Sequence, residues 1–449
     1  MTIVMFSLDA PMTRVMLAHP SWERTMLAAR LARLLDGRVH YAWIVTATTF
    51  AVILCSVGVR AAPGVLIVPL ERAFGWDAAT ISGAISLNIA LFGLGGPLAA
   101  ALMQSVGLRA TVLGSMALLA LGAGLSAFIT QVWQLYLTWG VLVGLGSSLG
   151  MLALAATVAN RWFVTKRGLV VGMLTAGNAS GQLVFLPLLA HISDAAGWRG
   201  VPLTAACAML ALLPVALLLL AESPAAIGVA PLGARAAPPE PPPSGNPFAI
   251  AFAGLRRGLA SLDFWLLAGS FGICGFSTYG LVITHLIPYC ADHGIPAVTA
   301  ASVLAAIGVF DFLGTLGSGW LTDRYDSRVL LFWYYGLRGV SLLWLPFSGF
   351  DLVSLSVFAV VFGLDFVATI PPTVALTTKV FGKRDAPVIV SWIASAHQLG
   401  GAFAALGAGE VRSATGSYVL AFAGSGALCF IASLLVLRIG RRPEGVVAA

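Results

Sequence analysis

Charged side chains are scarce in this sequence. Only 10% of its 449 residues are charged, whereas 59% are hydrophobic. A soluble domain carries about 25% charged and about 45–50% apolar residues, so no water-soluble fold of this length could bury the excess. The apolar surface must face lipid instead, and the composition predicts an integral membrane protein.

Motifs for cofactors and catalysis are also missing. The sequence contains no phosphate-binding segment of the Walker type, no spaced set of metal ligands and no nucleophile triad. The five cysteines stand singly in apolar runs, where thiols behave as small hydrophobic residues: Cys55, Cys207, Cys274, Cys290 and Cys429. We therefore expect no cofactor, no metal site and no catalytic residue, so an enzyme is not expected.

Long apolar runs, in contrast, recur along the whole chain. A helix that crosses a bilayer needs about 20 mostly apolar residues. Twelve such segments are expected, at 43–67, 78–103, 110–130, 133–158, 168–193, 200–221, 264–289, 298–321, 329–349, 352–378, 386–409 and 416–437. The sequence thus predicts an all-α protein with twelve transmembrane helices.

One proline-rich segment divides these spans into two sets of six. Residues 222–262 include the run Pro238-Pro239-Glu240-Pro241-Pro242-Pro243, which cannot continue a helix and is typical of an extended spacer. The expected units are an N-terminal segment at 1–40, six-helix bundles at 41–221 and 263–438, the linker at 222–262 and a tail at 439–449.

The halves are related by an offset of 219 residues. The loop from Gly319 to Arg328 maps onto the loop from Ala100 to Arg109, and Leu102 and Arg109 are retained there. Span starts at 43 and 133 map onto 262 and 352. Several coincidences at one offset favour a duplicated six-helix unit.

Basic residues predict the orientation. With a cytoplasmic N-terminus, cytoplasmic segments hold 20 of the 25 Lys and Arg residues, the opposite side holds three and the spans hold two. The positive-inside rule then places both termini in the cytoplasm. This distribution explains the net charge of +7 without a nucleic-acid partner. We expect the protein to be located in a bacterial inner membrane.

The first 40 residues contain no clean signal peptide. The stretch from Trp22 to Arg38 is basic and amphipathic. A helix on the membrane surface and a disordered cytosolic tail fit it equally well.

Few ionisable residues fall within the expected spans. They are Arg60, Asp311, Arg338, Asp365 and His397, with His285 expected nearer the membrane interface. A charge at mid-bilayer costs about 2.5–3.5 kcal/mol on insertion scales, so such residues normally face the bundle interior and have a partner.

Asp365 and Arg338 are candidates for function in the second half. Asp365 lies six residues before Pro371-Pro372, which must interrupt the helix. An acid beside a broken helix is typical of a site for a coupling ion, here a proton. Arg338 can bind a substrate carboxylate with two parallel hydrogen bonds. The alternative is a purely structural ion pair, in which Arg338 pairs with Asp365 or with Asp311.

Three further residues within the spans have two interpretations each. Asp311 can exchange a proton, or it can be a buried structural residue bonded by Thr315 one turn later. Arg60 can attract an anionic substrate, or its side chain can extend to the outer headgroups. His397 can switch its charge near neutral pH, or it can be a neutral histidine bonded between helices.

Several segments resemble a known family. The loop from Gly319 to Arg328 resembles the Gly-x-Leu-x-Asp-Arg-x-Gly-x-Arg motif of the major facilitator superfamily, with Asp326 at the second glycine. The segment from Arg161 to Leu169, with the glycines that follow, resembles the span 4–5 signature of monocarboxylate transporters and the related oxalate/formate antiporters. Arg60 to Val65 and Asp36-Gly37 with Tyr41-Ala42-Trp43 resemble their first-helix motifs.

This resemblance implies two six-helix bundles around a central cavity that opens alternately to each side. It implies proton-coupled transport of a small organic anion such as a monocarboxylate. From their positions within the spans, we expect substrate contacts at Arg60, Arg338 and Thr315 and proton coupling at Asp365, Asp311 or His397. The family's span 8 often carries Asp-x-x-x-Arg, and here Thr315 stands in place of the arginine. An exporter of amphiphilic compounds and a membrane sensor without transport activity are the alternatives.

Charged residues near the cytoplasmic ends of the spans are candidates for an inner gate: Asp323, Arg324, Arg328, Lys166 and Arg167. Ion pairs there would hold the gate shut in one state and break in the other. The alternative is that these charges only orient the chain in the membrane.

Overall fold

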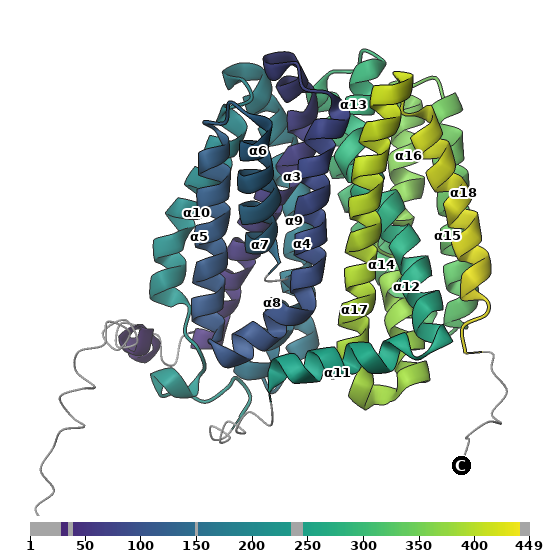
Figure 1. Cartoon of the computed structure of the whole chain (residues 1–449). Helices are drawn as coiled ribbons and strands as arrows, with labels where there is room; N and C mark the ends of the chain where they lie inside the picture. The colour runs from purple at the N-terminus through teal and green to yellow at the C-terminus, as the bar shows by residue number, and fades with distance from the viewer. Residues whose placement is uncertain (1–27, 35–38, 149–150, 235–245, 441–449) are drawn as a thin grey trace, which may run out of the picture.

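The helices form two groups that stand side by side (Figure 1). The computed structural model describes residues 28–34, 39–148, 151–234 and 246–440. Three expected features lie wholly or mainly outside these residues: the N-terminal segment with Asp36-Gly37, the proline run of the linker and the C-terminal tail.

The first group holds the six expected spans of the N-terminal half. Its elements are α3 (Tyr41–Phe74), α4 (Ala78–Ser105), α5 (Leu108–Ser126), α6 (Val132–Leu135), the π-helical η1 (Tyr136–Val143), α7 (Gly144–Ser147), α8 (Met151–Trp162), α9 (Arg167–Ala196) and α10 (Gly200–Leu219). The expected fourth span corresponds to the run from α6 to α8.

The second group is built from the remaining spans. Its elements are α12 (Leu262–Gly275), the π-helical η3 (Phe276–Ile283), α13 (Thr284–Asp292), α14 (Ala297–Thr322), α15 (Ser327–Trp344), the short η4 (Leu345–Phe347), α16 (Leu352–Asp365), α17 (Ile370–Thr415) and α18 (Val419–Val436). Gly382 divides α17 into two helices, because its φ of 77° is not helical. Glycine adopts this left-handed backbone conformation without strain.

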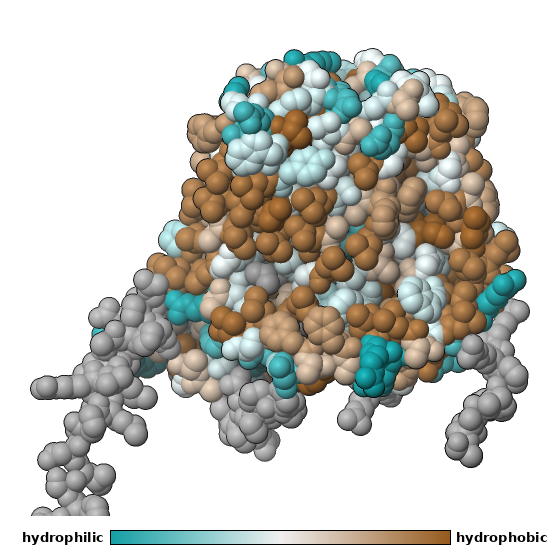
Figure 2. Space-filling view, viewed as in Figure 1, coloured by the Kyte–Doolittle hydropathy of each residue, from teal (hydrophilic) through white to brown (hydrophobic). Residues whose placement is uncertain are grey.

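The surface confirms that the chain is a multi-pass membrane protein. A hydrophobic band crosses the middle of the face shown in Figure 2, and hydrophilic side chains gather at both ends of that face. Within the described residues, ten helices are long and apolar enough to cross a membrane. The two other expected spans correspond to α6–α8 and to α9, so the twelve-span prediction is consistent with the structure.

The linker differs from the expected extended spacer. Residues Ala225–Ile227 form a short 3₁₀ helix, and Pro247–Leu259 form the amphipathic helix α11. Helix α11 lies across the lower end of the bundle in Figure 1, which we call the linker end. The indole N–H of Trp392 donates to Ala251 O of α11 at 2.9 Å. The spacer prediction is therefore wrong for 225–227 and 247–259, because apolar packing against the bundle stabilises helix there.

The start of the linker is fixed to the first group. The carboxylate of Glu222 accepts hydrogen bonds from the backbone N–H groups of Leu108 and Arg109 at 2.7 and 2.9 Å. It also pairs with Arg161 at 2.6 Å. Glu222 thereby satisfies two of the backbone donors that the first turn of α5 leaves unpaired.

The arginines related by the 219-residue offset have equivalent contacts. Arg109 donates to Leu217 O near the end of α10. Arg328 donates to Ile439 O just beyond α18, at 3.2 Å. Each half thus uses the same residue to hold the end of its last helix, as a duplicated unit would.

The two groups meet along α4 and α17. At the end opposite the linker, Ala79 N donates to the hydroxyl of Ser413 at 3.1 Å. Nearer the middle, the hydroxyl of Ser395 donates to Gly93 O at 2.9 Å. These are neutral hydrogen bonds, so separating the groups here would not break an ion pair.

Candidate binding site

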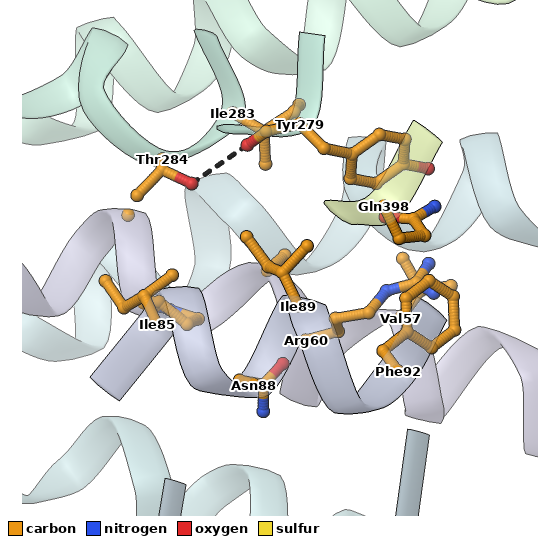
Figure 3. Close-up of a pocket in the computed structure, with 13 residues that line it drawn as sticks. Val57, Arg60, Ile85, Asn88, Ile89, Phe92, Tyr279, Ile283, Thr284 and Gln398 are labelled. Carbon is orange, nitrogen blue, oxygen red and sulfur yellow. Dashed lines mark hydrogen bonds between the residues drawn. The ribbon is translucent and has the colours of Figure 1, made fainter. Parts of the chain in front are cut away.

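A cavity lies between the two groups of helices. Its walls come from α3 and α4 on one side and from η3, α13 and α17 on the other (Figure 3). It is lined by Arg60, Asn88 and Phe92 from the first group and by Tyr279 and Gln398 from the second. A ligand bound here would contact both halves at once.

Arg60 supplies the positive charge of this cavity. Its guanidinium carbon lies 4.7 Å from the centre of the Phe92 ring and 5.9 Å from that of Tyr279. Aromatic faces attract a cation at this range. The arrangement keeps a guanidinium at the cavity wall, where its N–H groups can bind a carboxylate.

Neutral polar groups complete the lining. Two of them are engaged: Asn88 donates to Trp139 O at 2.7 Å, and Thr284 donates to Tyr279 O at 2.9 Å, the bond drawn in Figure 3. The side-chain oxygen of Gln398 is buried and has no hydrogen-bond partner within the described part of the chain. Gln398 can therefore accept a hydrogen bond from a ligand.

A buried ion pair lies apart from the cavity. Arg338 is fully buried, and its Nε donates to the Asp365 carboxylate at 2.7 Å. Its Nη2 donates to the backbone carbonyls of Asp365 and Phe366, and its Nη1 contacts Cys274 Sγ and Ser277 Oγ at 2.8 and 3.4 Å. The guanidinium thus satisfies carbonyls left open where α16 ends.

Asp311 binds the same region of the chain. Residues 366–369 separate α16 from α17, and we call this segment the helix break. Its carboxylate accepts from Val367 N at 3.0 Å and from the Thr315 hydroxyl at 3.1 Å. Helix α14 comes this close because residue 314 is glycine: an added Cβ would lie 1.8 Å from Leu364 O. The predicted hydrogen bond from Thr315 is confirmed.

The two histidines are both buried. The His397 ring packs at 4.6 Å from Phe271 and 5.7 Å from Tyr279, measured between ring centres. His285 binds the Tyr418 hydroxyl at 3.2 Å and Ala405 O at 2.8 Å. The expectation that His285 lies near the interface is wrong, since α13 turns this residue into the core of the second half.

The expected gate residues make local contacts at the linker end. Arg328 pairs with Asp326 at 2.8 Å, and these hydrogen bonds lower the pKa of the Asp326 carboxyl. Arg324 lies over the Trp320 ring at 4.0 Å, and Arg167 donates to Phe163 O at 2.6 Å.

The other two gate candidates lie directly next to the ends of helices. Asp323 follows the last turn of α14, and Lys166 precedes α9 with φ 64°. Among the ion pairs between described residues, none joins the two halves.

Comparison with known proteins identifies the family. The model of the Major Facilitator Superfamily matches residues 48–405. The chain belongs to this superfamily. Its curated relatives include monocarboxylate transporter 13 of Rattus norvegicus, 27% identical over 89% of both chains. Another is monocarboxylate transporter 11 of Homo sapiens, 28% identical over 89% of this chain and 83% of that one.

Solved structures of the superfamily share the fold. A bacterial homolog of the human lysosomal transporter Spinster aligns with TM-score 0.67 at 15% identity, over 91% of this chain and all of that one. The xylose transporter XylE from E. coli aligns with TM-score 0.66 at 13% identity, over 90% and 99% of the two chains. The predicted superfamily, fold and resemblance to monocarboxylate transporters are thereby confirmed.

The predicted site residues fall into two places within this superfamily fold. Arg60 lines the cavity, whereas Arg338, Thr315, Asp365 and Asp311 surround the helix break. His397 lies between the two places, against Tyr279.

Sequence reasoning overlooked Tyr279, Phe92 and the acceptor on Gln398. The only available signal was a polar or aromatic residue within an apolar run, and many packing residues share that signal.

Proposed function

We propose that this protein is a secondary transporter that moves a small organic anion of the monocarboxylate kind together with a proton, by alternating access. The observation that carries the proposal is the position of Arg60 in a cavity whose walls come from both halves. Relative movement of the halves would expose that cavity to one side and then to the other.

Arg60 is the proposed anion-binding group. Phe92 and Tyr279 pack against its guanidinium, and the guanidinium N–H groups have the geometry for a two-pronged carboxylate contact. The names of the curated relatives support a monocarboxylate as substrate. Arg338 and Thr315, first considered as substrate contacts, are better explained as groups that stabilise the helix break.

Asp311 is the proposed proton carrier, ahead of Asp365 and His397. Asp365 is held by the guanidinium of Arg338, which favours the charged carboxylate. The bonds to the Asp311 oxygen come from neutral donors, a backbone N–H and a hydroxyl. No hydrogen-bond partner of Asp311 in the described part of the chain carries a charge, so protonating Asp311 breaks no ion pair, and we therefore assign the proton to Asp311.

The neutral hydrogen bonds between the halves support alternating access. The hydrogen bonds between α4 and α17 are neutral and single, so a rocking motion can break them at small cost. We retain Asp323, Arg324, Arg328, Lys166 and Arg167 as candidates for an inner gate, in which new pairs would form on closure.

The alternatives have less support. An exporter of amphiphilic compounds calls for a large aromatic cavity, whereas this cavity has an arginine at its wall. The relatives named above are transporters, which supports neither a sensor nor an enzyme. They come from mammals and do not bear on the expected bacterial inner membrane.

Uptake into proteoliposomes tests the proposal. Purified protein should accumulate at least one of labelled propionate, lactate or benzoate when the outside is more acidic, and dissipating the pH gradient should abolish this accumulation. Asp311→Asn should still exchange the acid at equal pH but should not accumulate it, because an amide cannot carry the proton. Gradient-driven accumulation by Asp311→Asn at the wild-type level would remove Asp311 as the proton carrier.

Both termini are proposed to be cytoplasmic, from the distribution of basic residues. A phosphatase reporter that is active only outside the cytoplasm should be silent when fused after Ala449. The same reporter inserted between Asp292 and Ala297, in the loop at the opposite end, should be active. The reverse pattern would invert the topology.

A further inference from the structure

The π-helical segment η3 separates the cavity from the buried ion pair. On one side Tyr279 and Ile283 line the cavity. On the other side Ser277 Oγ lies 3.4 Å from Arg338 Nη1, and Cys274, just before η3, lies 2.8 Å from the same nitrogen. One short segment therefore contacts both the cavity and the buried ion pair.

Tyr279 spans the distance between the two places. Its ring centre lies 5.9 Å from the guanidinium carbon of Arg60 and 6.0 Å from the ring centre of Phe366. Phe366 is the residue between Asp365, which pairs with Arg338, and Val367, whose N–H binds Asp311. Tyr279 thus packs against both the proposed anion site and the Phe366 side chain, which belongs to the segment that the two acids hold.

The local backbone is suited to movement. In a π-helical turn the bond pattern widens by one residue, and such turns are frequent at functional sites. Here Thr284 donates its hydroxyl to the carbonyl of Tyr279, five residues earlier, at 2.9 Å. On the other side of the tyrosine ring, the segment from Phe366 to Thr369 separates helix α16 from helix α17. Two irregular segments therefore meet at one aromatic contact.

We infer that Tyr279 is the positioning residue that couples anion binding at Arg60 to protonation at the helix break. The inference rests on the proposed function. When an anion binds Arg60, the cation's attraction to the Tyr279 ring weakens and the ring shifts. That shift moves Phe366, and with it the Val367 N–H that binds the Asp311 carboxylate. Protonation of Asp311 acts along the same contacts in the opposite direction.

The other ionisable groups around Tyr279 and the break have defined places. Arg60 on α3 and His397 on α17 face the tyrosine ring. Arg338 on α15 and Asp365 on α16 are paired with each other, which leaves Asp311 on α14 as the acid held by neutral donors. Coupling through Tyr279 therefore predicts reciprocal effects: the proton changes anion affinity by the same factor as the anion changes proton affinity.

Three variants of the full-length protein in proteoliposomes test this inference. Tyr279→Leu removes the ring, Tyr279→Phe keeps it, and Phe276→Leu makes the matched change on the same π-helical segment, outside the cavity lining. The probe is whichever of propionate, lactate or benzoate the wild-type protein accumulates best. Each variant is measured for exchange at equal pH and for accumulation under a pH gradient.

We expect Tyr279→Leu to lower exchange, because the ring also packs against Arg60, and to lower accumulation by at least about fivefold more than exchange, the lower end of coupling factors between linked sites. Tyr279→Phe should keep the wild-type ratio of accumulation to exchange, and Phe276→Leu should match wild type in both assays. Probe affinity measured at pH 6 and pH 7.5 should depend on pH in wild type and lose that dependence in Tyr279→Leu.

Two results would overturn the inference. One is wild-type accumulation by Tyr279→Leu; the other is an equal loss of exchange and accumulation, which would show a structural role only. A wild-type protein that neither exchanges nor accumulates any probe would overturn the proposed function itself, which distinguishes the two failures.

Discussion

Neutralising Arg338 alone should prevent the protein from folding stably. In Arg338→Met, the Asp365 carboxylate and the carbonyls of Asp365 and Phe366 would stay buried without their donor. Removing one member of a buried ion pair costs about 3–5 kcal/mol, a large part of the 5–15 kcal/mol that is typical of a whole protein. Size-exclusion chromatography of the detergent-solubilised protein should show little or no monodisperse material.

Two double variants separate the charge of Arg338 from its hydrogen bonds. Arg338→Gln with Asp365→Asn removes both charges and leaves an amide that can still donate, so it should be more stable than either single change. Arg338→Asp with Asp365→Arg exchanges the charges, but aspartate cannot donate to the carbonyls at the break. The charge-reversed double variant should therefore not fold stably. A stable and active charge-reversed variant would contradict the structural role assigned to Arg338.

The Arg257–Asp385 pair provides a matched control. It joins α11 to the second half at 3.1 Å, and the side chain of Arg257 is 51% exposed. An exposed ion pair contributes about 0–1 kcal/mol. Arg257→Met should therefore yield folded protein with a nearly unchanged thermal midpoint. The contrast with Arg338→Met isolates the effect of burial from that of losing an arginine.

Changing Arg60 should abolish transport while leaving the fold intact. A two-pronged bond to a carboxylate supplies two charged hydrogen bonds, together about 3 kcal/mol or more, which is roughly a 100-fold change in affinity. Arg60→Gln should reduce uptake of the best probe acid by about 100-fold. Arg60→Lys should bind more weakly than wild type but better than Arg60→Gln, because lysine keeps the charge and loses the planar fork.

Arg199 is the control for this experiment. Its guanidinium lies 4.5 Å above the Trp198 ring, a comparable contact with an aromatic side chain, but it lies outside the cavity. Arg199→Gln should transport like wild type. Normal uptake by well-folded Arg60→Gln would remove Arg60 as the anion site and, with it, the main support for an anionic substrate.

The ionisable residues at the helix break had few possible partners in the sequence. Charges cannot stay unpaired in hydrocarbon, and the few candidates within the spans had few possible partners. Asp365 and Asp311 were therefore the two expected partners of Arg338, and Thr315 was the expected partner of Asp311. The structure pairs Arg338 with Asp365 and Thr315 with Asp311. Spacing in the sequence could not show that the same side chains also bind the backbone of the break, because those contacts come from different helices.

The linker illustrates where composition misleads. Eight prolines suggested an extended spacer over 222–262, yet Pro247 stands at the first turn of α11, where proline favours a helix. Gly254 and Gly258 let that helix pack closely against Val388 and Phe264. Only the docked position of α11 shows that Ala251, Gly254 and Gly258 face the bundle.

By itself the sequence determined that this protein is embedded in a membrane, that its helices come as two related sets and which charged residues lie within the spans. Exposing hydrophobic surface to water and placing a charge in hydrocarbon both cost so much free energy that their avoidance shows in the sequence pattern. The tertiary structure alone decided which charge faces the cavity and which is locked at a helix break. Arg60 and Arg338 look equivalent as cations within apolar spans. They differ only because helices distant in sequence surround one with aromatic rings at a cavity wall and the other with carbonyls and a carboxylate.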